Sequence, residues 1–553
     1  MSNILTYVLI FTLPLIHSSF LNYFGFNFNS LVYGNFEFTK VIFFNLLSSL
    51  IIFSFFIESL IKKEKIKIYY AAILSLIIIV SSISIIFSIS PFISFFGNQE
   101  KNHSFILILN LIGIFVVLTN KKKEVLNKYL KVIIISFIIT FLIGIKELLY
   151  PALNYLNEPK YAVSTYGSNH FFALSVILLL PILYKKIKGY YLYLLLILLF
   201  FIVFLTKSFL AISIFIIYIV IKTFGKKQGL IISFFLISIG LIIIFNYFPE
   251  KIHSLLSRFY IWENVISLYI SSFKNIIFGY GFESLEIMFP KEKNAYLYIF
   301  ENFGYFADRS HNLWIDILFS TGILGFSLSV YVSFLILKIT KNTYYYDTFM
   351  LFFIFVFFNF ASITNYLFFI ILFVIFNINK EKDNFISIKV NYYYLVFVFF
   401  FIFSFICEFK FYIAETYYKK GSLERASIIF PYPKYLIENG DNKGLDYYSF
   451  KPIYYYINNI NKNEENILNN CISLVNNYAI AESYIYCGRI LEKNNYKKES
   501  LEFYEKGLSK LPDLRNNKSD FYSNYLIKKT ISKNRFFSEK YGYLEEIVKK
   551  VGY

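Results

Sequence analysis

Two arginines stand apart from the other basic residues of this 553-residue chain. Arg258 and Arg309 are the only arginines in the first 424 residues, where lysine otherwise supplies the side chains of fixed positive charge. Arginine differs from lysine because its planar, permanently charged fork binds a phosphate or a carboxylate through two hydrogen bonds at once. Their placement therefore predicts a bound oxyanion, against the alternative that they fall there by chance in a lysine-rich chain.

Two histidines, an asparagine and a lysine add further candidate chemistry. His311 and Asn312 follow Arg309 almost directly, whereas His170 and Lys207 come from connections much earlier in the chain. Histidine exchanges protons near neutral pH, and lysine supplies a point charge for a phosphate. Each of these residues alone is typical of a helix end near a membrane surface, so its interpretation depends on what the fold brings beside it.

The composition indicates that these residues belong to a membrane protein. The chain is 57% hydrophobic and 22% aromatic, with a mean hydropathy of +0.55, which is too apolar for a soluble protein of this length. The first apolar run, Ile4 to Phe20, has no basic residue before it and no small-residue cleavage site, so we expect a retained helix rather than a signal peptide. The net charge of +18 needs no nucleic-acid partner, because lysines at the ends of apolar runs supply much of it.

The predicted fold class is all-α: a polytopic helical membrane protein with about 12–13 transmembrane helices and a C-terminal helical-repeat domain. Long runs rich in Ile, Leu and Phe favour helices over the alternating strands of a barrel. We predict spans at residues 4–20, 39–60, 68–90, 104–119, 131–150, 170–184, 189–206, 208–222, 229–247, 312–337, 346–360, 364–378 and 391–409.

The lysines predict which loops face the cytoplasm. Twenty lysines lie in alternate loops, near residues 62–67, 121–131, 185–188, 222–227, 338–341 and 380–389, whereas the other short loops and the span ends beside them hold five. Cytoplasmic loops of membrane proteins are enriched in lysine and arginine. We therefore expect the N-terminus inside, a membrane domain over residues 1–410 with a large outer loop over 248–311, and an extracytoplasmic α-helical domain over 411–553.

In this topology six residues with candidate chemistry fall on the same, outer side of the membrane. They are His103, His170, Lys207, Arg258, Arg309 and His311. A transporter or flippase would instead favour charged residues and broken helices near the middle of the spans, of which the sequence offers no clear case. A non-enzymatic membrane scaffold would leave the two arginines and His311 unexplained.

Several short segments carry a resemblance to a known family. In order they are Arg258-Phe259-Tyr260-Ile261-Trp262, Ile277-Phe278-Gly279-Tyr280-Gly281-Phe282, His311-Asn312-Leu313-Trp314 and Thr321-Gly322-Ile323-Leu324-Gly325, with weaker echoes in Ser94-Phe95-Phe96-Gly97 and Tyr166-Gly167-Ser168-Asn169. Together they resemble the O-antigen ligase and polymerase superfamily. Where family members often carry Ser-Arg-Gly, this chain has Thr206-Lys207-Ser208, so Lys207 would supply charge without a two-point fork.

The resemblance implies a glycosyltransferase of the bacterial inner membrane, multi-pass, with its active face outside the cytoplasm, in lipopolysaccharide biosynthesis. The donor would be a glycan on undecaprenyl pyrophosphate, held among membrane lipids. Three acceptors stay open, namely a lipid A core, a growing glycan and a protein. These would make the chain an O-antigen ligase, a polymerase or a protein O-oligosaccharyltransferase.

The resemblance also implies roles for single residues. Arg258 would be the main pyrophosphate contact, with Lys207 and Arg309 assisting, because cations that bind the departing diphosphate more tightly as charge builds up lower the barrier. His311 would take a proton from the acceptor hydroxyl, or donate a hydrogen bond to a phosphate oxygen if protonated. His170 and Asn312 would help to bind the substrate. We expect no cofactor and no metal, since Asp308 and Asp316 are too isolated to form a cation site.

The composition changes at about residue 411, where long apolar runs end. Residues 481–514 fit a tetratricopeptide-like helix pair, with the alternative that they form any α-helical hairpin. The matching residues are Tyr484, Gly488, Ser500, Tyr504, Gly507 and Pro512. Such a domain would dock an acceptor or a protein partner. Whether Cys471 and Cys487 form a disulfide is left open by the sequence.

Overall fold

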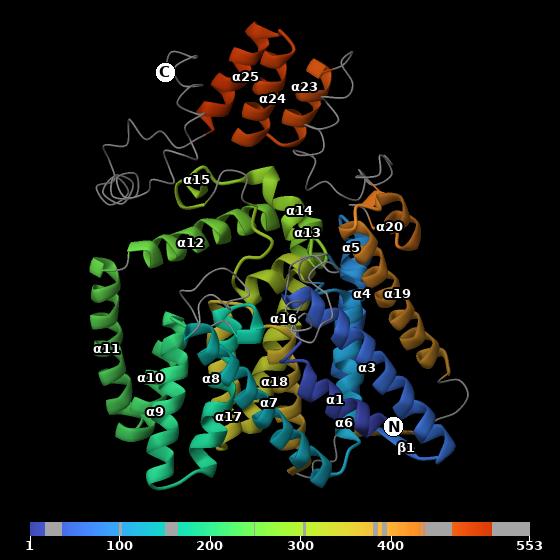
Figure 1. Ribbon diagram of the computed structural model, residues 1–553, viewed down its shortest axis with the longest axis vertical. Helices are drawn as coiled ribbons and strands as arrows, with labels where there is room; N and C mark the ends of the chain where they lie inside the picture. The colour runs from blue at the N-terminus through green and yellow to red at the C-terminus, as the bar shows by residue number, and fades with distance from the viewer. Residues whose placement is uncertain are drawn as a thin grey trace. The chain divides into compact units, whose positions relative to one another are not determined.

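The computed structural model describes most of the chain as α-helix (Figure 1). The described residues are 1–16, 36–98, 102–149, 164–247, 249–301, 306–379, 385–389, 395–432, 435–436 and 467–510. They divide into two compact units. Unit 1 comprises Met1–Ile242, Lys274–Glu283 and His311–Asp441, and unit 2 comprises Ile243–Phe273, Ser284–Ser310 and Asn442–Tyr553. Most of the predicted outer loop therefore belongs to the same unit as the C-terminal tail.

Each predicted span corresponds to a helix in the structure. These helices are α1 (Ser2–Thr12), α3 (Phe36–Ile61), α4 (Ala71–Ile86), α6 (Phe105–Thr119), α7 (Lys123–Leu149), α8 (Asn169–Lys186), α9 (Tyr190–Leu205), α10 (Phe209–Phe224), α11 (Lys226–Tyr247), α16 (Leu313–Thr340), α17 (Tyr344–Phe357), α18 (Ile363–Asn379) and α19 (Leu395–Lys419). Three of them, α3, α7 and α16, are long and apolar enough to cross a membrane. The end of the first predicted span lies outside the described residues, and the total number of crossings stays a prediction.

Burial explains how these apolar helices pack. Residues Phe171 to Ile182 of α8 are buried, so this helix lies inside unit 1 and is covered on all sides. By contrast α9 leaves Ile197 and Phe204 67% and 57% exposed, and α16 leaves Phe334 59% exposed. Large apolar side chains on the outside of a bundle are typical of a surface that meets lipid or a partner.

The all-α prediction missed a small sheet. Strand β1 (Lys65–Tyr69) pairs antiparallel with β2 (Phe385–Lys389), so the helix predicted from residue 68 begins instead at Ala71. Both strands alternate apolar and polar residues, and Ile66 and Ile68 lie opposite Ile388 and Ile386. This period of two is the pattern of a strand, which the adjoining apolar runs obscure in the sequence.

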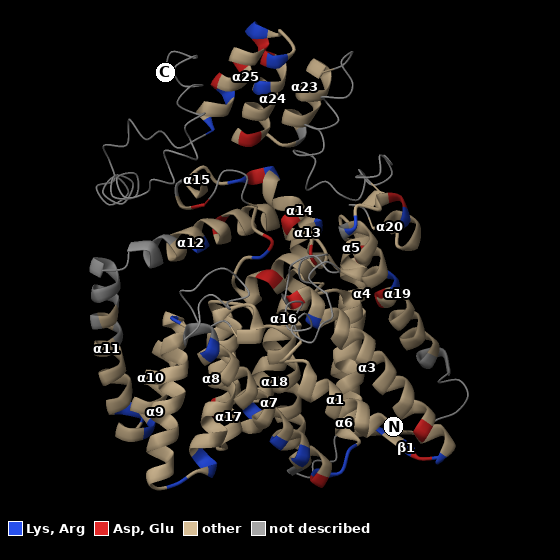
Figure 2. Ribbon diagram, viewed as in Figure 1, with Lys and Arg blue, Asp and Glu red and all other residues tan. Residues whose placement is uncertain are grey.

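The sheet and its neighbours gather the lysine-rich loops at one end of unit 1. The backbone of Lys67, in β1, exchanges two hydrogen bonds with the Asn120 carboxamide, at 2.9 and 2.8 Å. Lys222, at the end of α10, pairs with Asp347 of α17 at 2.7 Å. The Met1 amine pairs with Glu58 near the end of α3 at 2.6 Å. We call this the lysine-rich end of unit 1 (Figure 2) and the opposite one the lysine-poor end.

Shorter elements complete unit 1. They are α5 (Pro91–Phe96), the 3-10 helix η3 (Ser164–Tyr166), α13 (Phe273–Phe278), which begins at the boundary of the unit, and α20 (Leu423–Ile429). Unit 2 holds α12 (Pro249–Ile270), α14 (Leu285–Met288), the 3-10 helix η4 (Phe289–Glu292), α15 (Leu297–Phe300), α23 (Ile467–Asn477), α24 (Ala481–Lys493) and α25 (Lys497–Ser509). Helix α12 lies within residues 248–311, the predicted outer loop.

The tail contains the predicted helix pair, α24 and α25. A Cβ atom on Gly488 would come 2.6 Å from the Tyr504 ring, and one on Gly507 would come 2.7 Å from Ile485 Cγ1. The two glycines therefore allow the helices to approach closely, as in the predicted pattern. One hairpin does not distinguish a tetratricopeptide repeat from another helical pair, and Pro512 lies outside the described residues. Cys471 and Cys487 are free thiols buried in the core of this tail.

Candidate functional site

Two glycine-containing segments of the family resemblance meet in unit 1. The backbone N–H groups of Tyr280 and Gly281 donate to the carbonyl oxygens of Phe319 and Ser320, both at 2.9 Å. Gly322 has φ +66° and ψ −169°, which interrupts α16 at this point. A Cβ atom there would lie 2.6 Å from the Phe278 nitrogen and still closer to the Ile277 carbonyl. We call this contact, between residues 277–282 and 319–322, the glycine crossing.

Serines from α4, from α5 and from the connection between them complete the glycine crossing. The Ser88 hydroxyl donates to the Tyr280 carbonyl at 3.0 Å, and the Ser94 hydroxyl donates to the Phe282 carbonyl at 2.9 Å. The Ser84 hydroxyl, on α4, donates to the Ser320 carbonyl at 2.7 Å. Ser94 opens one of the weaker echoes of the family pattern, so two motif segments far apart in the sequence share hydrogen bonds here, and a third approaches them closely through Gly322.

A second cluster joins the start of α8 to the turn between α9 and α10. The Asn169 carboxamide donates to the Thr206 carbonyl at 2.9 Å, and His170 Nδ1 lies 3.0 Å from the Ser208 hydroxyl. Lys207 lies between them in the left-handed region, at φ +51°, with its side chain exposed. Two of the predicted site residues, His170 and Lys207, are therefore neighbours.

Phe360 connects this cluster to His311. Its ring centroid lies 5.5 Å from that of His311 and 5.2 Å from that of Phe171, the residue after His170. The Leu313 N–H also donates to the Asn359 carbonyl at 3.1 Å. The structure thus brings His311 and the start of α8 to the same part of the lysine-poor end.

Asn312 has a structural role at the start of α16. Its carboxamide oxygen accepts from the backbone N–H groups of Trp314 and Ile315, at 2.9 and 3.2 Å, and the residue is 2% exposed. Asparagine is a favoured N-cap because its side chain satisfies N–H groups that the first helical turn leaves open. This capping role explains an asparagine at position 312 without any ligand. The role of Asn312 in substrate binding stays a prediction.

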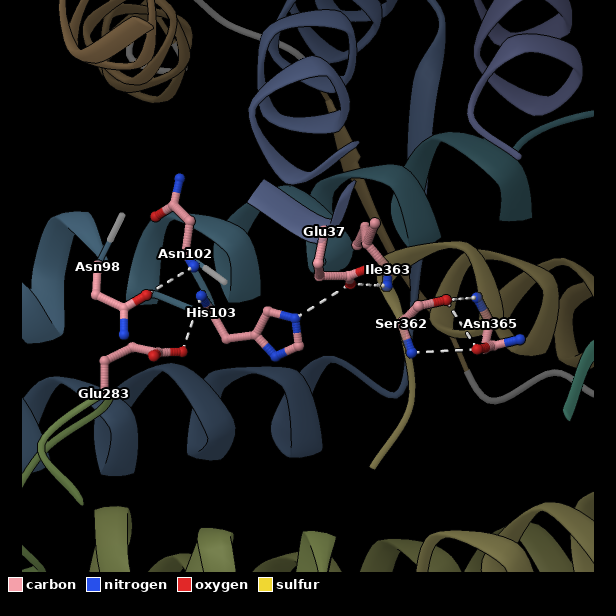
Figure 3. Close-up of polar contacts among 8 residues, drawn as sticks. All are labelled: Glu37, Asn98, Asn102, His103, Glu283, Ser362, Ile363 and Asn365. Carbon is pink, nitrogen blue, oxygen red and sulfur yellow. Dashed lines mark hydrogen bonds and ion pairs between the residues drawn. The ribbon is translucent and has the colours of Figure 1, made fainter. Parts of the chain in front are cut away.

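A carboxylate that the sequence analysis did not single out links these clusters (Figure 3). Glu37, at the start of α3, is 3% exposed. One of its oxygens accepts from the Ile363 N–H at 2.6 Å and lies 3.4 Å from His103 Nε2. The His103 N–H donates to Glu283, directly after the glycine crossing, at 3.0 Å. Glu37 and His103 therefore join the crossing to the starts of α3, α6 and α18.

The same network reaches the start of α8. Ser362 and Asn365 cap α18 reciprocally, since the Ser362 N–H donates to the Asn365 side chain at 3.1 Å and the Asn365 N–H donates to the Ser362 hydroxyl at 3.3 Å. The Asn365 amide then donates to the Phe171 carbonyl at 3.2 Å and to the Ser175 hydroxyl at 2.8 Å. These polar contacts, linked through the neighbouring residues Ser362 and Ile363, connect the glycine crossing to the helix that carries His170.

Unit 2 holds the two arginines. Arg258 lies on α12, and Trp262 follows one turn later on the same side of this helix. The Trp262 indole N–H donates to the Ser310 carbonyl at 2.7 Å, so α12 holds the segment that contains Arg309. Arg309 is 8% exposed, whereas Arg258 is half-buried. The two arginines therefore belong to neighbouring segments of one unit, with the tryptophan of the family pattern between them.

A buried ion pair joins the loop of unit 2 to its tail. Lys293 Nζ and Glu482 of α24 lie 2.6 Å apart, and neither side chain is exposed. The Tyr298 hydroxyl also donates to Glu482, and the Lys293 ammonium lies 4.2 Å from the Tyr298 ring centroid. Burial lowers the pKa of Lys293, and the charge of Glu482 partly offsets this effect. This pair could not be predicted from the sequence, because its partners are 189 residues apart.

We expect Lys293→Met to destabilise unit 2 by about 3 kcal/mol, because it leaves the Glu482 carboxylate buried without its cation. The double variant Lys293→Met/Glu482→Leu should recover much of this loss, since it removes both charges. Limited proteolysis of the purified chain would measure the effect as faster cleavage within residues 284–310. If the wild type and the single variant were cleaved at the same rate, the ion pair would not hold the loop against the tail of unit 2.

Another buried carboxylate of unit 1 is Glu408. Glu408 of α19 is 2% exposed and accepts from the Asn45 amide at 3.0 Å and from the Asn102 amide at 3.3 Å. The predicted span ended next to Glu408, whereas α19 continues to Lys419. An ionisable residue inside a helical membrane bundle is a candidate functional residue in its own right.

The six predicted site residues are thus divided between the units. His170, Lys207, His311 and Asn312 belong to unit 1, and Arg258 and Arg309 belong to unit 2. Within the described part of the chain, no group of three or more His, Cys, Asp or Glu residues could hold a metal ion. Comparisons of the chain with protein-family models, curated proteins and solved structures found no match. The family resemblance therefore rests on the motif segments of the sequence.

Proposed function

We propose that this chain is an O-antigen-ligase-like glycosyltransferase of the bacterial inner membrane. It moves a glycan from an undecaprenyl-pyrophosphate carrier to an acceptor on the outer side. One observation carries the proposal: segments of the family pattern meet at the lysine-poor end of unit 1. In the glycine crossing, residues 277–282 contact residues 319–322 and Ser94. Asn169 and His170 contact Thr206 and Ser208, the two neighbours of Lys207 in the chain.

The chemistry needs cations for the leaving group and a base for the acceptor. The carrier departs as a pyrophosphate, so cations that bind it more tightly as charge builds up lower the barrier. We assign Arg258 to the main pyrophosphate contact because its fork offers two hydrogen bonds to one phosphate. Lys207 and Arg309 add charge, and His311 takes the proton of the acceptor hydroxyl. The side chain of Lys207 is exposed, so the pyrophosphate can reach it.

Transfer from a purified donor tests this proposal. The full-length chain would be supplied with a polyprenyl-pyrophosphate glycan and, separately, with lipid A core, free glycan or protein acceptors. We expect Arg258→Lys to lose at least about tenfold in rate, because one oriented charge contact contributes a few kcal/mol. Arg425→Lys is the matched control, since Arg425 lies exposed on α20 and has no assigned role. The acceptor that is consumed distinguishes a ligase from a polymerase and from a protein transferase.

A polytopic flippase or transporter is the second candidate, favoured by the buried Glu408. That reading predicts movement of the lipid-linked glycan across a vesicle membrane without transfer to any acceptor. Glu408→Gln should then abolish the movement, whereas Arg258→Lys should leave it intact. This pair of results, together with no transfer by the wild type, would replace the glycosyltransferase assignment.

A further inference from the structure

A cavity opens at the lysine-rich end of unit 1, away from the candidate site. Its volume is about 1060 Å³, and it is lined by the last turns of α8, α10 and α16, the first residue of α11 and the start of α17. Helix α8 carries His170 at its first turn and Lys185 at its last. At 1.5 Å per residue, the cavity lies roughly 20–25 Å from His170 along this helix. It is therefore a separate feature from the glycine crossing and the His170 cluster.

The charged lining of this cavity is strongly basic. Its charged side chains are Lys185, Lys222, Lys226, Lys338, Lys341 and Asp347. Lys222 and Asp347 pair at 2.7 Å, so the other four lysines leave a net positive charge around the opening. Four ammonium groups in one concave site attract a polyvalent or phosphate-bearing anion more strongly than lysines scattered over a surface.

The uncharged lining suits the rest of such a ligand. Tyr184, Tyr218, Tyr344 and Tyr346 add phenol hydroxyls to the lining, a group that is able to donate a hydrogen bond to a phosphate oxygen. Phe334 of α16 forms part of an apolar wall and is 59% exposed. Tyr331 and Val330 continue that exposed surface along α16, at 52% and 43%. An apolar surface that begins inside a basic cavity fits an acyl chain attached to an anionic head group.

We propose that this cavity binds the phosphate head group of an anionic phospholipid, with an acyl chain along the exposed face of α16. The lysines neutralise the phosphate, and the tyrosine hydroxyls fix its oxygens. Lysine suits a phosphodiester of single charge, which does not need the bidentate fork of arginine. The inference requires that the bundle lie in a membrane, but it does not depend on glycosyl transfer.

Lipid binding to the purified full-length chain tests the inference. Short-chain phosphatidylglycerol, phosphatidylcholine of the same chain length, and inorganic pyrophosphate would be titrated in detergent and followed by native mass spectrometry. We expect saturable binding of phosphatidylglycerol, which weakens as salt rises. Lys338→Gln/Lys341→Gln should weaken it by about thirtyfold, and Lys338→Arg/Lys341→Arg should retain it. Lys222 is left unchanged because its removal would take away the cation that pairs with Asp347.

The matched control removes two exposed lysines at the start of α7, at the same end of unit 1, in Lys122→Gln/Lys123→Gln. If both double variants lost the same affinity for phosphatidylglycerol, the inference would be overturned, because the lysines would then act only through the overall charge of this face. Binding of phosphatidylcholine as tight as that of phosphatidylglycerol would also overturn it. If pyrophosphate bound more tightly than the lipid, the cavity would be a phosphate site, and its assignment to a phospholipid would be wrong. A variant that elutes as an aggregate would be replaced by Lys185→Gln, which removes one lining charge at the end of α8.

Discussion

His311→Asn is expected to reduce the rate of glycan transfer by about a thousandfold at saturating donor and acceptor. A positioned general base contributes roughly 10²–10⁴-fold, and the asparagine carboxamide does not take up a proton. Asparagine is a better test than alanine, because His311 has φ +56° and asparagine tolerates this region. The substitution therefore removes the imidazole with little strain in the backbone next to Ser310 and Asn312.

Donor binding separates the two roles considered for His311. If the imidazole acts as the base, His311→Asn should bind the polyprenyl-pyrophosphate glycan as the wild type does and fail only in transfer. If the imidazolium binds a phosphate oxygen, donor affinity should fall together with the rate. A variant that transfers glycan at the wild-type rate would exclude both roles, and the assignment of His311 to the reaction would be wrong.

Features that depend only on neighbouring residues, such as apolar runs and lysine-rich loops, could be recognised from the sequence. Each predicted apolar run corresponds to a helix in the structure. The runs could be recognised because the lysines and glycines between them mark helix ends in the sequence itself. The sorting of lysines also anticipated that the loops around residues 62–67, 120 and 385–389 meet at one end of unit 1. Strand β1 was missed because Ile66 and Ile68 adjoin an apolar helix, which extends the run and hides the alternation.

Contacts between distant segments could not be predicted in this way. Glu37 looks like a single acidic residue at the start of an apolar run, yet its partners His103 and Ile363 lie 66 and 326 residues away. The motif segments were recognised one by one, but their meeting in the glycine crossing depends on how α4, α13 and α16 pack. His170 and Lys207 were both proposed for the site, and only the fold shows that they are neighbours.

The glycine crossing predicts a large loss of stability in Gly322→Ala. With φ +66° and ψ −169°, Gly322 occupies a backbone region that is essentially closed to other residues. The new Cβ would also lie 2.6 Å from the Phe278 nitrogen, where a backbone atom cannot move aside without opening the crossing. We expect strain and overpacking together to destabilise unit 1 by about 5 kcal/mol.

Gly240→Ala supplies the control, because it is also a glycine-to-alanine change in an apolar helix, α11. A Cβ atom at Gly240 meets nothing within 4 Å, and alanine favours a helix by roughly 0.5–1 kcal/mol over glycine. In detergent, Gly240→Ala should therefore unfold at or above the wild-type temperature and Gly322→Ala well below it. Similar unfolding temperatures for the two variants would mean that the crossing is not tightly packed. His170, Lys207 and His311 would then lack the rigid support that the proposed transfer reaction requires.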